Sequence, residues 1–129
     1  MRRWVCSIPL LFVALPTFPA DRCSDHLSQA KLAFDAQNLE LAAAQFRHAV
    51  EVCPQPDEVR IPLAQVQYLL GREEDAERQL EEVIEKDRKN TEALYALGRI
   101  YYQQNRFPEA VEQLKRVVEL EPDNYKAHD

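Results

Sequence analysis

The fold of this chain is decided by residues 91–124, which read TEALYALGRIYYQQNRFPEAVEQLKRVVELEPDN. Apolar residues recur every three or four positions on both sides of a break at residues 104–106, which is the spacing of one face of an α-helix. The two faces, one before the break and one after it, carry Leu94, Leu97, Ile100 and Tyr101, and Val111, Leu114, Val117 and Val118. Pro108 comes directly after the break, where a helix begins and needs no backbone donor. The stretch therefore predicts two amphipathic helices joined by a tight turn.

This pattern repeats with a period of 34 residues, in the blocks 23–56, 57–90 and 91–124. The eighth, twentieth, twenty-fourth and twenty-seventh positions of the period carry residues of matching size in every block. They are Ala30, Ala64 and Gly98; Ala42, Ala76 and Ala110; Phe46, Leu80 and Leu114; and Ala49, Val83 and Val117. Small residues at the first two of these positions let paired helices approach closely, and the larger residue at the third fills the space below them. The sequence predicts an all-α chain of three antiparallel helical hairpins, with turns at 37–38, 71–72 and 104–106.

Residues 91–124 resemble the tetratricopeptide repeat (TPR) almost position for position. The residues that carry the resemblance are Leu94, Leu97, Gly98, Tyr101, Ala110, Leu114, Val117 and Pro122. The second block resembles the repeat less fully, and the first has His26 and Gln29 where the family favours apolar residues. The resemblance covers residues 23–124 and implies a right-handed α-solenoid that acts as a non-catalytic scaffold for proteins or peptides.

Pro62 conflicts with this regularity. It lies five residues after Asp57, too deep in the expected helix for all of the backbone hydrogen bonds to form. We expect the first helix of the second block to begin irregularly, or later than its counterparts.

Residues 1–20 differ in composition from the rest of the chain. A basic start at Arg2 and Arg3 precedes an uncharged run, 4–18, that is too short to span a bilayer, and a small residue follows at Ala20. A cleaved signal peptide is predicted, with an uncleaved membrane anchor as the alternative. The TPR-like domain would then occupy residues 21–124, and residues 125–129 would begin a fourth repeat. Repeat arrays normally end in a polar capping helix, so we expect the third hairpin to keep a partly open apolar face that further repeats, a partner or a second copy would cover.

Removal of the signal would leave two cysteines, Cys23 and Cys53, at the first and thirty-first positions of one block. Because the two helices of a hairpin run antiparallel, these positions lie side by side, which suits the roughly 4.4–6.8 Å between α-carbons that a disulfide requires. Disulfides persist outside the cytosol, so the cysteine pair and the export signal support each other. A structural disulfide between Cys23 and Cys53 is predicted, with two unpaired cysteines as the alternative.

The first helices of successive hairpins line the concave surface of a TPR solenoid, so residues that recur on them form ladders along it. The fifth, ninth and twelfth positions give Leu27, Ile61 and Tyr95; Lys31, Gln65 and Arg99; and Phe34, Tyr68 and Tyr102. Aromatic rings beside hydrogen-bond donors favour binding of an extended peptide or a partner helix, although such rings also suit packing of helix against helix. Some TPR domains clamp the terminal carboxylate of a chaperone, at positions that hold Leu27, Lys31, Pro62, Glu92 and Ala96 in this chain. Only Lys31 is cationic, so that clamp is expected to be absent.

Charge and residue spacing exclude several classes of function. A net charge of −6 without a basic stripe disfavours binding of nucleic acid. His26, His48 and His128 are far apart in sequence, with no second ligand at metal-binding spacing, and no glycine-rich phosphate loop occurs. The acidic runs 73–75 and 81–82 are expected to face water. No catalytic residue, metal or cofactor is therefore predicted.

These observations favour a scaffold in the periplasm or another exported compartment that binds a protein or peptide in its concave groove. The first alternative is an assembly element whose open C-terminal hairpin stacks on more repeats or on another copy. The second alternative is an accessory domain of a longer exported protein.

Overall fold

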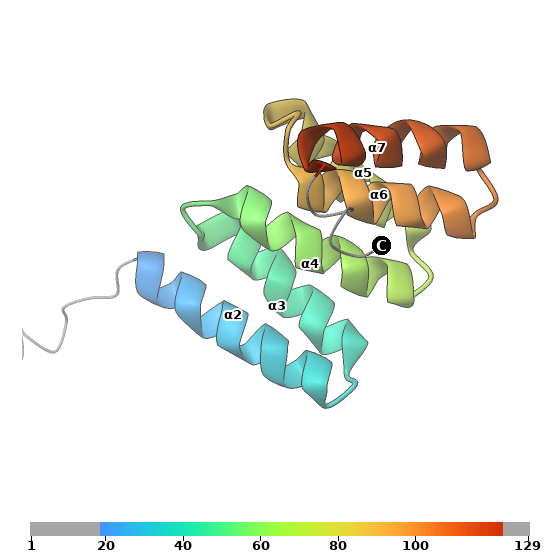
Figure 1. Cartoon of the computed structure of the whole chain (residues 1–129). Helices are drawn as coiled ribbons and strands as arrows, with labels where there is room; N and C mark the ends of the chain where they lie inside the picture. The colour runs from blue at the N-terminus through green and yellow to red at the C-terminus, as the bar shows by residue number, and fades with distance from the viewer. Residues whose placement is uncertain (1–18, 123–129) are drawn as a thin grey trace, which may run out of the picture.

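The structure is a computed structural model that describes residues 19–122, with side chains from Arg22 onward (Figure 1). Its helices are α2 (Pro19–Asp35), α3 (Leu39–Val52), α4 (Pro56–Leu69), α5 (Glu73–Lys86), α6 (Thr91–Gln103) and α7 (Phe107–Leu120). They pair as three antiparallel hairpins, α2–α3, α4–α5 and α6–α7, which confirms the all-α prediction. Residues 1–18 of the expected signal peptide and the expected start of a fourth repeat at 125–129 lie outside the described part of the chain.

The three hairpin turns share one backbone geometry. Gln37, Gly71 and Asn105 occupy equivalent positions, and each has a positive φ, of 63°, 83° and 63° respectively. At each turn the next amide donates to a carbonyl five residues earlier, and the N–O distance is 2.8 Å in all three cases. Glycine adopts this left-handed conformation without steric cost, and Gly71 does so at the expected turn at residues 71–72. The shared turn keeps the two helices of each hairpin antiparallel and closely packed.

The small residues of the repeat lie where the paired helices approach. Ala30, Ala42, Ala64 and Ala76 have no exposed surface. A Cβ atom added at Gly98 would lie 2.8 Å from Cγ and Cδ2 of Leu114, well inside van der Waals contact. The larger and apolar residues of the twenty-fourth and twenty-seventh positions fill the space beside them, as expected.

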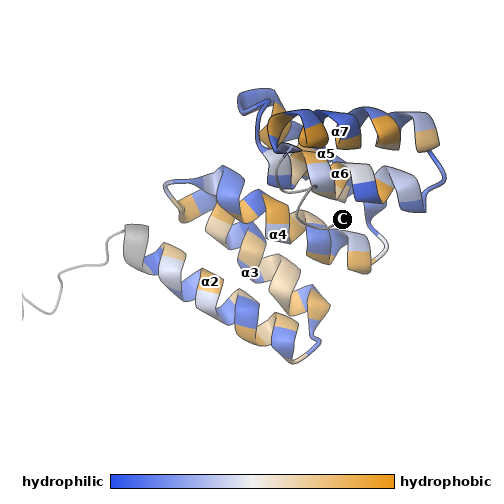
Figure 2. Cartoon of the chain, viewed as in Figure 1, coloured by the Kyte–Doolittle hydropathy of each residue, from blue (hydrophilic) through white to orange (hydrophobic). Residues whose placement is uncertain are grey.

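The core consists of two clusters, and α4 contributes to both. Val59, Leu63 and Val66 pack with the first hairpin, whereas Ile61 and Ala64 pack with α5 and α6. Figure 2 shows hydrophobic and hydrophilic residues alternating along the helices, as this two-sided packing of α4 requires. Helix α4 therefore contacts both α3 and α6, and α5 contacts α6 as well.

The expectation about Pro62 is wrong. Helix α4 begins at Pro56, earlier than its block boundary rather than later, and Pro62 lies inside it. Pro56 at the start of the helix has its φ already restricted to a helical value. Pro62 lacks the N–H that would donate to the carbonyl of Glu58, but burial of Ile61 and Leu63 on either side holds the helix together.

The predicted disulfide between Cys23 and Cys53 is present, with an S–S distance of 2.02 Å and a Cα–Cα distance of 4.8 Å. It ties the N-terminal part of α2 to the residue that follows α3. His26 stands in the same hairpin where the repeat favours an apolar residue. Its Nδ1 lies 2.8 Å from Oε1 of Gln45, and its ring stacks on His48 with 5.3 Å between ring centroids. Polar contacts and a covalent bond therefore replace part of the apolar core in this hairpin.

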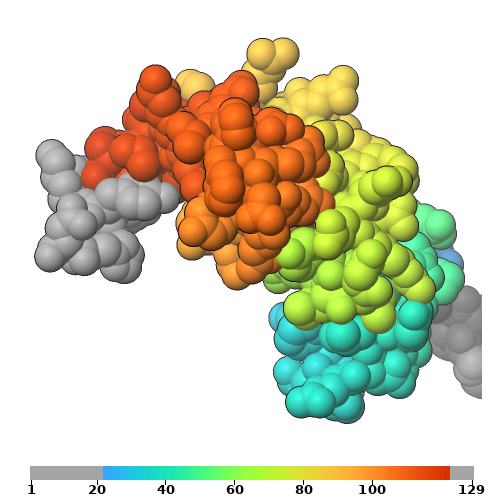
Figure 3. Space-filling model, turned by 90° about the vertical axis from the view of Figure 1, so that its right-hand side faces the viewer, coloured from blue at the N-terminus to red at the C-terminus, as the bar shows by residue number. Residues whose placement is uncertain are grey.

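The described chain bends into an arc. In Figure 3 the first and last hairpins extend to the same side, which leaves that side hollowed. Among the helices that the structure describes, none combines the length and apolar character needed to cross a membrane.

Candidate functional site

A predominantly apolar cleft with a volume of about 540 Å³ lies between α2 and α4. Its apolar wall is formed by Leu27, Phe46, Val59, Val66 and the disulfide between Cys23 and Cys53. Polar side chains stand around this wall, namely Lys31, Asp35, Gln55, Glu58 and Gln65. An apolar floor with a polar rim is the usual form of a site that receives an apolar group of a ligand.

The cleft exists because α2 stands away from α4. Within the described residues, the backbones of α4 and α6 approach within 8 Å between α-carbons, whereas those of α2 and α4 do not. Helix α2 instead rests on α3, to which the disulfide holds it. Pro54 and Pro62 line the space that a closer approach would have filled.

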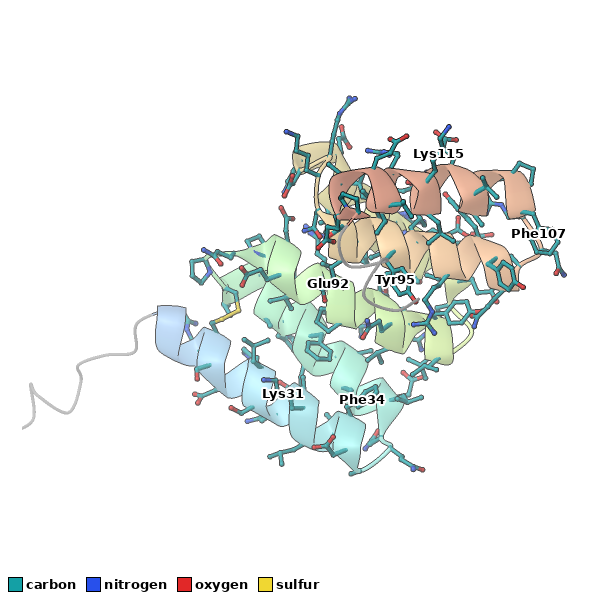
Figure 4. The ribbon with its side chains drawn as sticks, viewed as in Figure 1. Lys31, Phe34, Glu92, Tyr95, Phe107 and Lys115 are labelled. Atoms are coloured by element: carbon teal, nitrogen blue, oxygen red, sulfur yellow. A yellow bond between two sulfur atoms is a disulfide. The ribbon has the colours of Figure 1, made fainter. Side chains whose placement is uncertain are left out.

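A second cleft, of about 320 Å³, lies between the C-terminal halves of α4 and α6. Its walls are Phe34, Gln65, Tyr68, Leu69, Leu80, Ala96, Arg99, Ile100 and Gln103. Phe34 and Gln65 line both clefts, so the two clefts are adjacent, and we refer to them together as the groove. Figure 4 shows Lys31 and Phe34 on α2, the helix that contributes both side chains to the groove.

The structure brings six of the nine predicted groove residues together. Leu27 and Lys31 line the first cleft, Tyr68 and Arg99 line the second, and Phe34 and Gln65 line both.

The other three predicted groove residues lie elsewhere. Ile61 is only 3% exposed and packs in the second core cluster, so it is not accessible to a partner. Tyr95 and Tyr102 are exposed but line neither cleft. The Arg99 guanidinium lies 5.9 Å from the centroid of the Tyr95 ring, and Tyr102 meets Phe107 edge-on with 5.4 Å between ring centroids.

Several residues that line the groove were not predicted from the sequence, although some of them recur at one position of the 34-residue period. The thirteenth position of the period holds Asp35, Leu69 and Gln103, and all three line the clefts. Val59 and Glu58 carry no such signal, because they reach the groove only where α2 stands away from α4.

The cationic side chains differ in their ion-pair partners between the groove and the side formed by the second helices. On the second-helix side, Arg106 pairs with Glu109 at 2.9 Å and Glu77 at 3.1 Å, and these partners, Glu109 first, raise its pKa. The same guanidinium lies 4.3 Å from the ring centroid of Tyr101, whose hydroxyl forms a long hydrogen bond of 3.5 Å with Glu81. Burial, followed by the charges of Glu81 and Glu77, raises the pKa of Tyr101.

In the groove, by contrast, neither Lys31 nor Arg99 forms an ion pair with any residue of the described part. Among the described residues that line the second cleft, Arg99 is the one charged side chain. The first cleft has Lys31 together with Asp35 and Glu58. The two clefts therefore differ in local charge.

His26 and His48, far apart in sequence, are neighbours in space on the first hairpin. Among residues 19–122, no group of three or more potential metal ligands comes together.

Known structures share this fold. The first TPR of Spaghetti (RPAP3), bound to the HSP90 peptide SRMEEVD, is 19% identical, with a TM-score of 0.73 over 84% of this chain and 86% of that one. The Sgt2 TPR domain from Aspergillus fumigatus is also 19% identical, with a TM-score of 0.73 over 82% of this chain and 70% of that one. The Arabidopsis OM64 TPR domain is 17% identical, with a TM-score of 0.72 over 81% and 86%.

No curated protein matches the sequence. A family profile described as the tetratricopeptide repeat matches residues 33–90 and 74–128, which together span more than half of the chain. The repeat period, the three hairpins and this match agree, and the chain belongs to the tetratricopeptide repeat family.

Proposed function

We propose that this chain is an exported, non-catalytic scaffold that binds a segment of another protein in the groove formed by the two clefts. The observation that carries the proposal is the groove itself, whose two adjacent clefts leave apolar surface accessible. TPR domains are typically scaffolds for proteins or peptides, and the groove is built mainly from the first helices α2, α4 and α6.

The groove combines rigid and accessible parts. Phe46, Val59 and Val66 are nearly fully buried in the core, so the floor of the first cleft is held in place. Phe34 is 41% exposed and stands where the two clefts meet. Aromatic side chains that gain burial in such central positions often dominate the free energy of binding.

Export to the periplasm, or to another oxidising compartment, is part of the proposal. The pairing of Cys23 with Cys53 supports it, because structural disulfides are rare in the reducing cytosol. The signal-like composition of residues 1–20 supports it independently. A fusion of these residues to a reporter that is active only outside the cytosol tests this part, and an inactive reporter would contradict it.

The binding function is tested by affinity capture from an extract of the compartment in which the chain resides. The full chain is compared with a groove variant, Phe34→Ala with Tyr68→Ala, and with a control variant, Val111→Ser with Val118→Ser, that removes exposed apolar surface from α7. Circular dichroism checks that all three remain folded. A partner retained by the chain and the control but lost by the groove variant supports the proposal, whereas a partner retained by all three contradicts it.

Assembly through the last hairpin is a second candidate function, which a different observation favours. Val111 is 62% exposed, Phe107 47% and Val118 43%, so α7 carries an accessible apolar side. Further repeats or a second copy of the chain would bury it, as neighbouring repeats do in longer arrays. Sedimentation of the chain and of the Val111→Ser, Val118→Ser variant tests this candidate. Association that the substitutions abolish supports it, and a monomer at all concentrations contradicts it.

A further inference from the structure

We infer that the groove selects a segment with one large apolar side chain and, a few residues away, an aspartate or glutamate. The apolar side chain enters the first cleft, and the carboxylate meets Arg99 in the second cleft. The inference rests on the proposed function of the groove and adds to it the chemistry of the partner.

The first cleft is suited to an apolar side chain. Leu27, Val59, Val66 and the disulfide sulfurs form one apolar wall, and 540 Å³ is ample for a leucine, methionine or phenylalanine side chain. Its charged residues include both signs, since Lys31 is accompanied by Asp35 and Glu58. This cleft therefore gives an incoming carboxylate no net attraction.

The described residues that line the second cleft carry hydrogen-bond donors and a single positive charge. Arg99 lines the cleft together with Gln65, Gln103 and Tyr68, whose side chains carry two amides and a hydroxyl. The Arg99 guanidinium also lies 5.9 Å from the centroid of the Tyr95 ring. Within residues 19–122, neither amide forms a hydrogen bond and Arg99 has no carboxylate partner. A guanidinium, amides and a hydroxyl that line one cleft suit a carboxylate.

Long-range attraction cannot explain a preference for an acidic segment. The chain carries a net charge of −6, so its overall field repels such a segment at long range. On other surfaces Arg60, Arg72 and Arg106 already pair with carboxylates of the chain. The effect of Arg99 is therefore local, and a substitution of Arg99 can be compared with one of a cation outside the groove.

The experiment measures binding of short synthetic peptides by fluorescence anisotropy to the full chain. Each peptide is a Ser/Gly sequence with both ends blocked, one phenylalanine, and one aspartate placed at increasing separations from it. Matched peptides carry asparagine in place of aspartate, or serine in place of phenylalanine. The proteins are the chain itself, Arg99→Gln, and the control Arg47→Gln. Arg47 is an exposed residue of α3 that lines neither cleft, and its substitution changes the net charge equally.

We expect at least one separation at which aspartate binds the unmodified chain about fivefold more tightly than asparagine, as an exposed ion pair would give. Arg99→Gln should bring this ratio to one, and Arg47→Gln should leave it unchanged. Replacement of the phenylalanine should weaken binding to all three proteins. The aspartate preference should fall as the salt concentration rises.

Two results overturn the inference and leave the proposed function standing. They are an aspartate preference that survives Arg99→Gln, and phenylalanine peptides that bind in a manner sensitive to Phe34→Ala but show no such preference. Tighter binding of a peptide with a free C-terminal carboxylate than of its blocked aspartate counterpart also overturns it, because the carboxylate would then come from a chain end. Failure of every phenylalanine peptide to bind contradicts both the inference and the groove as the binding site.

Discussion

The first hairpin should depend on its disulfide more than on its apolar core. Its core is built largely from alanines, with Ala30, Ala42, Ala43 and Ala49 fully buried, and a half-buried His26 stands where an apolar residue would fit. Small side chains bury little apolar area, so each contributes little to the free energy of unfolding. Replacing both Cys23 and Cys53 by alanine removes the one covalent link between α2 and the end of α3.

The loss of stability in the double variant follows from the length of the loop that the disulfide closes. The two cysteines are 30 residues apart. In the chain-entropy description, a loop of that length restricts the unfolded state by about 3.6 kcal/mol at 25 °C. For a domain of this size, a loss of 1 kcal/mol lowers Tm by about 4–8 °C, so the double variant should melt roughly 15–30 °C below the oxidised chain.

The assay is thermal and urea unfolding followed by far-UV circular dichroism, with amide hydrogen exchange to locate the loss. Amides of α2 and α3 should exchange faster in the double variant, whereas those of α6 should change least, because repeats contact only their neighbours. Reduced wild-type chain serves as the control. It differs from the oxidised chain only in this bond, so it should melt close to the double variant. An oxidised chain and a double variant with equal Tm would refute this reasoning, as would faster exchange spread evenly over all six described helices.

Three further substitutions test the packing and the electrostatics of the array by urea unfolding. Gly98→Ala should destabilise the chain by about 1–2 kcal/mol, because its Cβ would lie 2.8 Å from the Leu114 side chain. An unchanged urea midpoint would contradict this, because the Leu114 side chain would then move aside at no cost in stability. Pro62→Ala should stabilise it by about 1–3 kcal/mol, since alanine restores the donor for the Glu58 carbonyl; a lower midpoint would contradict this. Tyr101→Phe should reduce the loss of stability above about pH 10. The pKa of Tyr101 is raised in the folded state, so its hydroxyl loses its proton at a lower pH in the unfolded state. Deprotonation therefore favours the unfolded state as the pH rises, and the free energy of unfolding falls. Identical slopes of stability against pH for both proteins would exclude this contribution.

The repeat period was sufficient to predict the helices, their turns and the disulfide. Each position of the period occurs in three blocks. The small residues that recur at the eighth and twentieth positions therefore predicted where the paired helices contact each other. The cysteine pairing followed from the antiparallel hairpin for the same reason. Pro62 was misjudged because a local rule was applied alone, while the burial of its neighbours decides where α4 begins.

The groove was harder to predict, because equivalent positions of a finite array have different neighbours. The fifth position shows this directly: Leu27 is half-buried, Ile61 is buried, and Tyr95 is 47% exposed. Helix α4 has hairpins on both sides, so its fifth residue enters the core, whereas α2 and α6 each lie in a terminal hairpin of the described array. The period identifies which residues correspond, and only the packing of each hairpin decides which of them a partner can reach.

The weakness of the first hairpin and the presence of the groove have a common origin. If α2 packed on α4 as α4 packs on α6, larger apolar residues would fill the first cleft and bury Leu27 and Phe34. The chain instead fixes α2 to α3 through Cys23 and Cys53, and Leu27 and Phe34 of α2 stay partly accessible beside α4. A covalent bond thus stabilises a hairpin that leaves part of its apolar surface unburied. We propose that a partner covers this surface. The same apolar side chains then contribute both to the folding of this hairpin and to binding.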